Sequence, residues 1–326
     1  MKYLLIICLQ LTFAISTFGQ TGEIIELDTN YFQLKDSLSN KLTFEQTVNE
    51  INKLCTNDVQ RISLIAGWIY NNIDFDLTKF YNGGTVNDYK TVFTNRKGTC
   101  GDYSAIFSEF CNRLNIENEI IEGYVPVYNS ENKVYYETNH AWNVVTVNGN
   151  WYHCDLLGFS GYLRQASFSE YEFIKTPYTN SLFTQALSFL SEHIPADPMW
   201  QLSNYPIPLD TLIKYGSDSK VDSTCGYLDY KKEIGEYIKL SEQKKLLRFA
   251  DNAHRYNKNN HNVVIITNYN ASVDLINDWN GDKQKLLLAR KYLVKAKNHI
   301  NNARNGVEVL APEIEVSLNI IKKYVP

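Results

Sequence analysis

The chain has 326 residues, 44% of them hydrophobic, and a formal net charge of −4 at pH 7. This composition suits a globular protein of one large domain or two ordinary ones, with an ample apolar core. The charge is uneven, because residues 1–225 carry 15 Lys and Arg against 25 Asp and Glu, whereas residues 226–326 carry 17 against 11. This reversal supports two structural units. Even the second unit is too weakly basic to indicate nucleic-acid binding, and the chain has no aromatic–basic recognition motif.

The N-terminus has the pattern of a secretory signal peptide. Met1 and Lys2 precede a compact apolar run from Tyr3 to Ile15, and the segment Ser16-Thr17-Phe18-Gly19 offers small residues at the spacing that a signal peptidase accepts. A run of about 13 residues is too short to span a bilayer. We therefore expect a signal peptide at residues 1–19 and an exported protein, periplasmic or secreted. An uncleaved anchor is the alternative; no later segment is apolar enough for a membrane span.

Helical apolar spacing appears first at residues 43–57 and 58–72, and a loop is expected at Asn82-Gly83-Gly84. Residues 100–114 are predicted to form a further helix with one apolar stripe. Asn115 is a plausible stop for this helix, because Asn tolerates the left-handed conformation.

Extended apolar segments follow at residues 119–127, 140–147 and 150–156. The last two flank Asn148-Gly149, and β-rich runs joined by Asn-Gly are typical of a tight hairpin. We predict a two-residue type I′ turn with positive φ at both turn residues. The predicted pairs are Val147–Asn150, Thr146–Trp151, Val144–His153 and Trp142–Asp155.

The rest of the chain divides into a loop-rich part and a helical part. Residues 160–224 hold five prolines and are predicted to be mostly loop. Beyond Cys225 the spacing is helical, without a repeat of fixed period, so we expect a helical domain and not a solenoid. The predicted domains are therefore residues 20–224 and residues 225–326.

Cys100 is the candidate nucleophile. The segment Gly98-Thr99-Cys100-Gly101 places its thiol in the first turn of a predicted helix, after a flexible approach. Unsatisfied N–H groups and the helix dipole lower the pKa of a thiol there. The same N–H groups can bind the oxyanion of a tetrahedral intermediate. The alternative for any cysteine is a small buried core residue, and Cys111, on the apolar stripe, is assigned to it.

His140 is the candidate base and Asp155 the candidate orienting acid. In the predicted register both residues share one face of the hairpin as diagonal neighbours, within reach of an imidazole–carboxylate hydrogen bond. A carboxylate so placed fixes the imidazole tautomer and stabilises its charged form. His153 lies on the same face, but a structural or surface role is favoured for it. Cys154 points to the opposite face and is assigned to packing.

The cysteine count leaves the thiol states open. The predicted mature chain would hold five cysteines, an odd number, so at least one thiol stays unpaired within the chain. There is no CxxC pair, so we expect no structural zinc site. We also expect no cofactor.

These motifs together resemble the transglutaminase-like superfamily. The resemblance rests on G-T-C-G-D-Y from residue 98, H-A-W-N-V-V-T-V-N-G-N-W-Y-H-C-D from residue 140, W-I-Y-N-N-I from residue 68, and Phe93 with Arg96. H-I-P-A-D-P-M-W-Q from residue 193 is similar to the kyphoscoliosis-peptidase-like branch, which includes bacterial exported proteins. The resemblance covers about residues 45–210.

The resemblance implies an α+β fold with a papain-like core, in which a helix carrying Cys100 packs on an antiparallel sheet carrying His140 and Asp155. It implies that these three residues form a catalytic triad that uses thioester chemistry, without a metal. One departure is that the acid is followed by Leu156-Leu157-Gly158 where the family commonly has Trp-Gly. Trp68 matches an oxyanion donor of the crosslinking enzymes by analogy, but its apolar helix face favours a core role.

Two classes of function remain. The first is an exported acyl-transfer enzyme acting on protein or peptide amides through a thioester at Cys100. For this enzyme we favour hydrolysis over crosslinking. Crosslinking requires an enclosed tunnel that excludes water, and nothing in the sequence indicates one. The second is a catalytically silent binding or scaffold module of the cell envelope. The sequence leaves the substrate, the oligomeric state and the role of the helical domain open.

Overall fold

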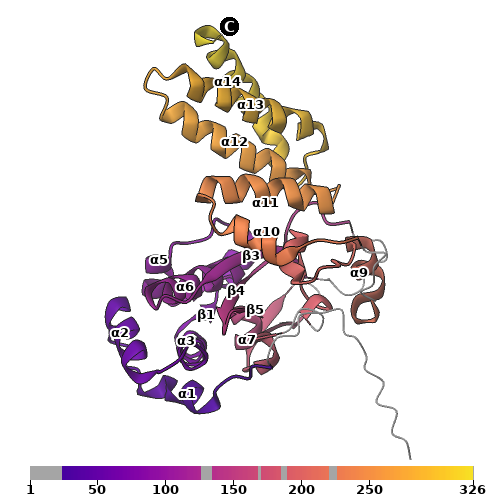
Figure 1. Ribbon diagram of the computed structural model, residues 1–326. Helices are drawn as coiled ribbons and strands as arrows, with labels where there is room; N and C mark the ends of the chain where they lie inside the picture. The colour runs from indigo at the N-terminus through magenta and orange to yellow at the C-terminus, as the bar shows by residue number, and fades with distance from the viewer. Residues whose placement is uncertain (1–23, 126–133, 168–169, 185–188, 220–225, 326) are drawn as a thin grey trace, which may run out of the picture.

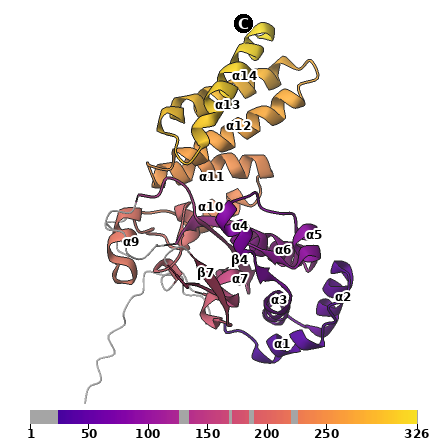
Figure 2. The same ribbon diagram turned by 180° about the vertical axis from the view of Figure 1, so that it is seen from behind.

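The protein is described by a computed structural model over residues 24–125, 134–167, 170–184, 189–219 and 226–325. The predicted signal peptide at residues 1–19 lies outside the described residues, as does Cys225. A sheet-containing body holds the N-terminal helices, and the C-terminal helices project from it as an elongated stack (Figures 1 and 2). None of the described helices is both long and apolar enough to cross a bilayer.

Helices dominate the first part of the chain. Both predicted early helices are confirmed. The Thr43 side chain caps the first and the Asn57 side chain caps the second, each by accepting a hydrogen bond from a backbone N–H of its helix. The Cys100 helix is also confirmed, with Asn115 at φ 57° just beyond it. The helices are α1 (Thr29–Gln33), η1 (Leu34–Ser37), α2 (Phe44–Leu54), α3 (Asp58–Asn72), α4 (Leu77–Asn82), α5 (Tyr89–Asn95) and α6 (Cys100–Arg113).

A four-stranded antiparallel sheet in the order β5-β4-β3-β8 forms the centre of the body. Its strands are β3 (Asn118–Tyr124), β4 (His140–Val147), β5 (Asn150–Cys154) and β8 (Ile194–Pro195). A separate parallel pair joins β1 (Asp74–Phe75) to β2 (Lys97–Gly98), which leads directly into α6.

The predicted hairpin turn and its register are confirmed. Asn148 and Gly149 have φ of 50° and 74°, and β4 and β5 pair Val147 with Asn150 and onward to Asn143 with Cys154. The ladder stops one pair before Trp142–Asp155. At that point the Asp155 N–H instead donates to the Ser181 carbonyl at 2.8 Å, and a helix begins at the next residue.

Both faces of the sheet are buried, by different partners. Val145, Val147 and Cys154 join one apolar cluster with α3 and α6. Trp142 and Val144, on the other face, join a second cluster with the 3₁₀-helix η3 (Pro198–Gln201) and with α10 (Tyr230–Tyr237). The sheet is therefore a middle layer, and α10 covers the face that the N-terminal helices do not.

The segment predicted to be mostly loop contains more regular structure than expected. A short helix, a second hairpin and several helical turns lie between residues 156 and 219. They were not predicted, because the sequence shows no clear apolar alternation there. The elements are α7 (Leu156–Ser160), β6 (Gly161–Gln165), β7 (Tyr171–Lys175), η2 (Thr179–Ser181), β8, η3, α9 (Leu209–Tyr215) and η4 (Gly216–Asp218).

The C-terminal region is helical, as predicted. It consists of α10, α11 (Glu242–Tyr256), α12 (His261–Asn277), α13 (Lys283–His299), η6 (Ile300–Asn302), η7 (Val307–Val309) and α14 (Leu310–Tyr324). Helices α12 to α14 form an apolar cluster of their own, from Ile265 onward. By contrast, α10 packs on the sheet, and Ala253 of α11 joins a cluster with Tyr124 and Ile194. Helices α10 and α11 therefore share apolar clusters with the body, and the domain boundary at residue 225 stays a prediction.

This packing predicts how truncations behave. A chain that ends at residue 224 loses Tyr230, Ile234 and Tyr237 from the sheet face, each of which contributes about 1.5–3 kcal/mol when buried. Its free energy of unfolding should fall by about 5 kcal/mol or more, a large part of a domain's total. A chain that ends at Asn260 keeps α10 and α11 and should unfold cooperatively. Urea unfolding followed by tryptophan fluorescence measures both; equal stability of the two truncations would contradict the shared core.

Candidate active site

Cys100 is the first residue of α6, and the residue is partly exposed. Thr99 before it is extended and forms the helix N-cap position. N–H groups in the first turn of a helix have no partner within the helix and carry the positive end of its dipole. The backbone N–H of Ala141, next to the candidate base, also donates to the Cys100 sulfur. Both features stabilise a thiolate at this position.

Asp102 is a buried acid that holds the backbone before Cys100 in place. Its fully buried carboxylate accepts hydrogen bonds from the Thr99 N–H at 2.8 Å and the Asn87 N–H at 2.7 Å. Lys79 forms an ion pair with both of its oxygens, at 2.7 and 2.8 Å. The charge is therefore compensated, and the turn that presents Cys100 is held from two sides. At Gly98, a Cβ would lie 2.4 Å from the Asp102 Cβ, so only glycine fits there.

His140 begins β4 and contacts the other two candidate residues. Its Nε2 lies 3.0 Å from Asp155 Oδ2, within the range predicted from the hairpin register. A further hydrogen bond joins its ring to Cys100. Because Nε2 is directed at the carboxylate, Nδ1 is the nitrogen left for the sulfur. The predicted geometry of Cys100, His140 and Asp155 is thus confirmed, while their catalytic roles stay predictions.

Asp155 lies just beyond β5 and caps α7. Its Oδ1 accepts the Leu157 N–H at 3.0 Å, and its Oδ2 accepts from His140. The segment after the acid differs from the family pattern, but it supports the carboxylate: a Cβ on Gly158 would lie 2.5 Å from Oδ2, so this close approach requires glycine. Leu156 and Phe159 of α7 are buried in the core beneath.

His193 is a second imidazole on the same carboxylate oxygen, and the sequence analysis did not assign it to the site. Its Nε2 lies 3.0 Å from Asp155 Oδ2, and its ring is buried and stacks on Phe189 at 4.1 Å. The residue stands in the H-I-P-A-D-P-M-W-Q phrase of the family resemblance, which was the available signal. Nothing in the local sequence indicates that a residue 38 positions from Asp155 contacts it. We assign His193 as a positioning residue for the acid.

His153 has the structural role expected for it. It is fully buried, its Nδ1 accepts the Trp142 indole N–H at 3.1 Å, and its ring stacks on the other side of Phe189 at 4.4 Å. Burial, together with the nearby His193, lowers the pKa of His153 to about 3. The ring is therefore neutral at physiological pH and serves as an acceptor.

The electrostatics favour a thiolate–imidazolium pair. Burial alone would raise the pKa of Cys100, but the hydrogen bond and charge of His140 hold it below the ordinary value. Burial likewise would lower the pKa of His140, yet Asp155 and Cys100 raise it to about 10. The two histidine contacts hold the pKa of Asp155 well below its usual range despite burial. A negative sulfur, a positive ring and a negative carboxylate therefore alternate across the site.

The other described cysteines behave as core residues. Burial raises the pKa of Cys55 to about 11 and that of Cys154 to about 12, and it raises the pKa of Cys111 well above the ordinary value. All four described cysteines are free. Trp68 is fully buried and stacks on Phe93 at 5.3 Å, which agrees with a core role.

Among the described residues, two groups of side chains have ligand atoms close enough to hold a metal ion. One is His140, Asp155 and His193, whose proximity the hydrogen bonds to Asp155 Oδ2 already explain. The other is His254, His261 and His299, far along the chain in the helical region. The sequence analysis expected no metal and singled out neither group.

Comparison with known proteins finds one family to which part of the chain is similar. Residues 45–156 match the family model described as the transglutaminase-like superfamily. The kyphoscoliosis peptidase of Mus musculus is 24% identical over 187 residues, which cover 55% of this chain and 28% of that protein. The Homo sapiens protein of the same name is 22% identical over 189 residues, covering 56% and 28%. The chain therefore spans less than a third of the length of these curated relatives.

Two solved structures overlap parts of the chain. A candidate cysteine protease from Cytophaga hutchinsonii has a TM-score of 0.26 and 23% identity, covering 34% of this chain and 37% of that one. A structure described as a TGase has a TM-score of 0.28 and 15% identity, covering 44% and 41%. Cys100, His140 and Asp155 all lie within residues 45–156, the part of the chain that is similar to the transglutaminase-like superfamily.

Proposed function

We propose that the protein is a cysteine-dependent acyl-transfer enzyme that acts on protein or peptide amide bonds, with Cys100 as nucleophile, His140 as general base and acid, and Asp155 as the orienting acid. The observation that carries this proposal is the continuous chain of contacts from the Cys100 sulfur through the His140 ring to the Asp155 carboxylate. A thiolate beside an imidazolium is the reactive form of such a pair.

The proposed reaction has two steps. The Cys100 thiolate attacks the amide carbonyl carbon, and first-turn N–H groups of α6 bind the oxyanion. The C–N bond then breaks as His140 gives its proton to the leaving amine, which leaves a thioester. In the second step His140 takes a proton from water, the resulting hydroxide attacks the thioester, and a carboxylate product leaves as the thiolate returns.

Solvent access supports hydrolysis over crosslinking. Cys100 is partly exposed as a residue, and the His140 side chain retains 12% of its accessible surface. Transfer to a lysine amine requires that water be kept from the thioester, whereas both Cys100 and His140 retain exposed surface here. We therefore propose a protease or amidase as the main activity, and a catalytically silent module is the alternative that the tests below distinguish.

Export is proposed from the N-terminal sequence, where a basic start, a short apolar run and small residues follow one another. Mass spectrometry of the protein isolated from its host should find a mature N-terminus at Gln20. A retained Met1 would contradict cleavage of a signal peptide.

We predict that alkylation of Cys100 slows less between pH 8 and pH 6 than alkylation of a thiol with an ordinary pKa. A thiol with an ordinary pKa of about 8.5 would react roughly 80-fold more slowly at pH 6 than at pH 8. Because His140 lowers the pKa of Cys100, its thiolate persists at the lower pH. Iodoacetamide labelling followed by peptide mass spectrometry measures each thiol, and Cys55, Cys111 and Cys154 should stay unlabelled until the protein unfolds.

Two aspartate variants serve as a matched pair for this experiment. Asp155→Asn removes the charge that raises the pKa of His140, so labelling of Cys100 at pH 6 should fall at least 10-fold. Asp197→Asn alters another buried aspartate that caps a helix, through Met199 N–H at 3.2 Å, and should leave labelling unchanged. An equal response of the two variants would remove the support for Asp155 as the orienting acid.

A further experiment measures whether water or an amine accepts the acyl group in the second step. Incubated with a peptide mixture, a lysine-like amine and H₂¹⁸O, the protein should yield carboxylate products that carry ¹⁸O in excess over amine adducts. Cys100→Ser should abolish both products, because the thioester cannot form. Predominant amine adducts would establish crosslinking, and Cys100 labelling without either product would establish the silent alternative.

A further inference from the structure

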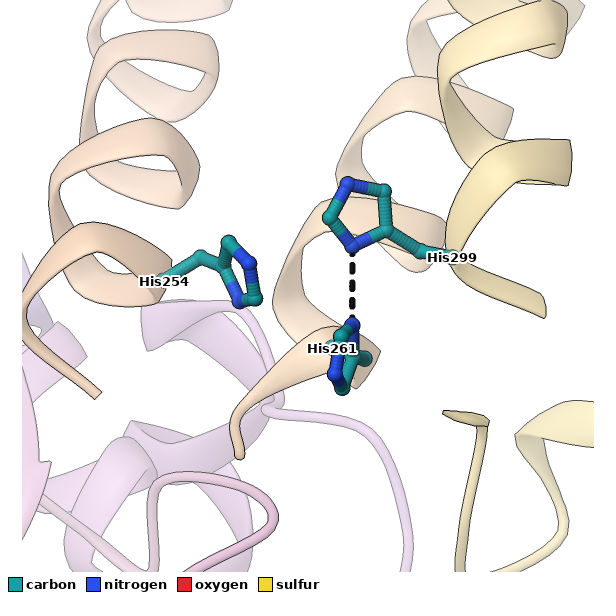
Figure 3. Close-up of side chains that lie close together, drawn as sticks. All are labelled: His254, His261 and His299. Atoms are coloured by element: carbon teal, nitrogen blue, oxygen red, sulfur yellow. Dashed lines mark hydrogen bonds between the residues drawn. The ribbon is translucent and has the colours of Figure 1, made fainter. Parts of the chain in front are cut away.

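Three of the six histidines of the chain lie together in the helical region, away from the candidate active site. His254 is in the last turn of α11, His261 is the first residue of α12, and His299 is the last residue of α13. One ring nitrogen of each lies within 4.8 Å of those of the other two. Figure 3 shows the three rings converging from separate helices, with His261 and His299 joined by a hydrogen bond.

We propose that His254, His261 and His299 form a binding site for a divalent transition-metal ion of the zinc class. Imidazole is a preferred ligand of Zn²⁺, Co²⁺, Ni²⁺ and Cu²⁺. With Zn–N bonds of about 2.0–2.1 Å, a tetrahedral ion holds its nitrogens about 3.3 Å apart. The Nδ1 atoms of His261 and His299 are 2.9 Å apart, so this pair would separate by about 0.4 Å to bind the ion, and the His254 nitrogen starts within 4.8 Å of both rings' ligand atoms. Three protein ligands leave the fourth position to water.

The hydrogen bonds of the cluster prepare its nitrogens for a metal. His254 Nδ1 lies 3.2 Å from the Asn260 carbonyl oxygen, to which it can only donate, so its Nε2 keeps the lone pair. A carbonyl in this position is the usual second partner of a metal-binding histidine. Between His261 and His299 one Nδ1 must donate and the other accept. Binding moves the donor's proton from Nδ1 to Nε2 through solvent, with no net release of protons.

The charges around the cluster keep the rings neutral, which is the form that binds metals. Burial, the neighbouring histidines and Lys295 lower the pKa of His299 to about 4. The other charged groups that face the rings are Lys258, Arg304 and Asp251. The Asp251 carboxylate pairs with Lys295, which offsets the charge of that cation. This ion pair also joins α11 to α13, the two helices that carry His254 and His299.

A metal at this position would fasten the helical region to the body. The loop between His254 and His261 holds Asn257 and Asn260, whose side-chain amides donate to the Tyr124 hydroxyl at 3.1 and 3.2 Å. Tyr124 ends β3, a central strand of the sheet. An ion that links α11, α12 and α13 would therefore stabilise the loop that contacts the sheet.

The test uses the full chain without an affinity tag, stripped of metal and titrated with Co²⁺ and then Zn²⁺. We expect one Co²⁺ per chain, with the visible absorption of a tetrahedral site, displaced by one Zn²⁺. His261→Gln and His299→Gln should each weaken binding at least 100-fold. His140→Gln, which alters the other group of close ligand atoms, should leave stoichiometry and affinity unchanged.

Chemical footprinting of the wild-type protein gives a test that does not depend on the folding of a variant. Zinc should protect His254, His261 and His299 from diethylpyrocarbonate, as read by peptide mass spectrometry. It should raise the thermal midpoint of the wild type and of His140→Gln, but not that of His261→Gln or His299→Gln. Substoichiometric binding would overturn the proposal. So would loss of binding in His140→Gln with retention in His261→Gln, or protection of His140 and His193 instead, because the metal would then belong to the active site.

Discussion

A carboxylate buried as deeply as that of Asp155 is tolerated only if hydrogen bonds and opposite charge replace the water it has lost. Here two imidazoles meet one of its oxygens, and the Leu157 N–H meets the other. The donors come from β4, from the residue before β8 and from α7, so satisfying a single charge brings three segments of the chain together. His140 is oriented as part of this arrangement, and its orientation in turn stabilises the Cys100 thiolate.

The parts of the site that could be predicted are those set by local rules. Asn148-Gly149 specifies the turn, the turn specifies the register, and the register places His140 and Asp155 on one face. The position of Cys100 at a helix start follows in the same way from the glycines around it. The individual helices and strands of the body were predicted from apolar spacing within single segments, which is why α3, α6, β4 and β5 lie where they were expected. The α+β class itself was implied by the family resemblance.

The parts that were missed depend on contacts between distant segments. His193 reaches Asp155 only because β8 pairs with β3, and no spacing in the sequence encodes that pairing. The packing of α10 on the sheet is likewise a tertiary contact, and the change in composition near residue 225 did not predict it. His254, His261 and His299 have no motif spacing, since each comes from the end of a different helix.

The end of β3 connects these observations. Gly123 pairs with His140 on one side and with Pro195 on the other, while Tyr124 pairs with Ile194, the neighbour of His193. Both imidazoles that contact Asp155 are therefore held in register by the same two residues. A Cβ on Gly123 would lie 2.3 Å from the Ile194 carbonyl oxygen, which shows how closely the strands approach there. Because the Tyr124 hydroxyl accepts hydrogen bonds from the loop between α11 and α12, the helical region contacts the strand that positions the active-site histidines. Displacement of that loop should therefore shift Asp155 more than Cys100, because Asp102 and Lys79 hold Cys100 in place separately.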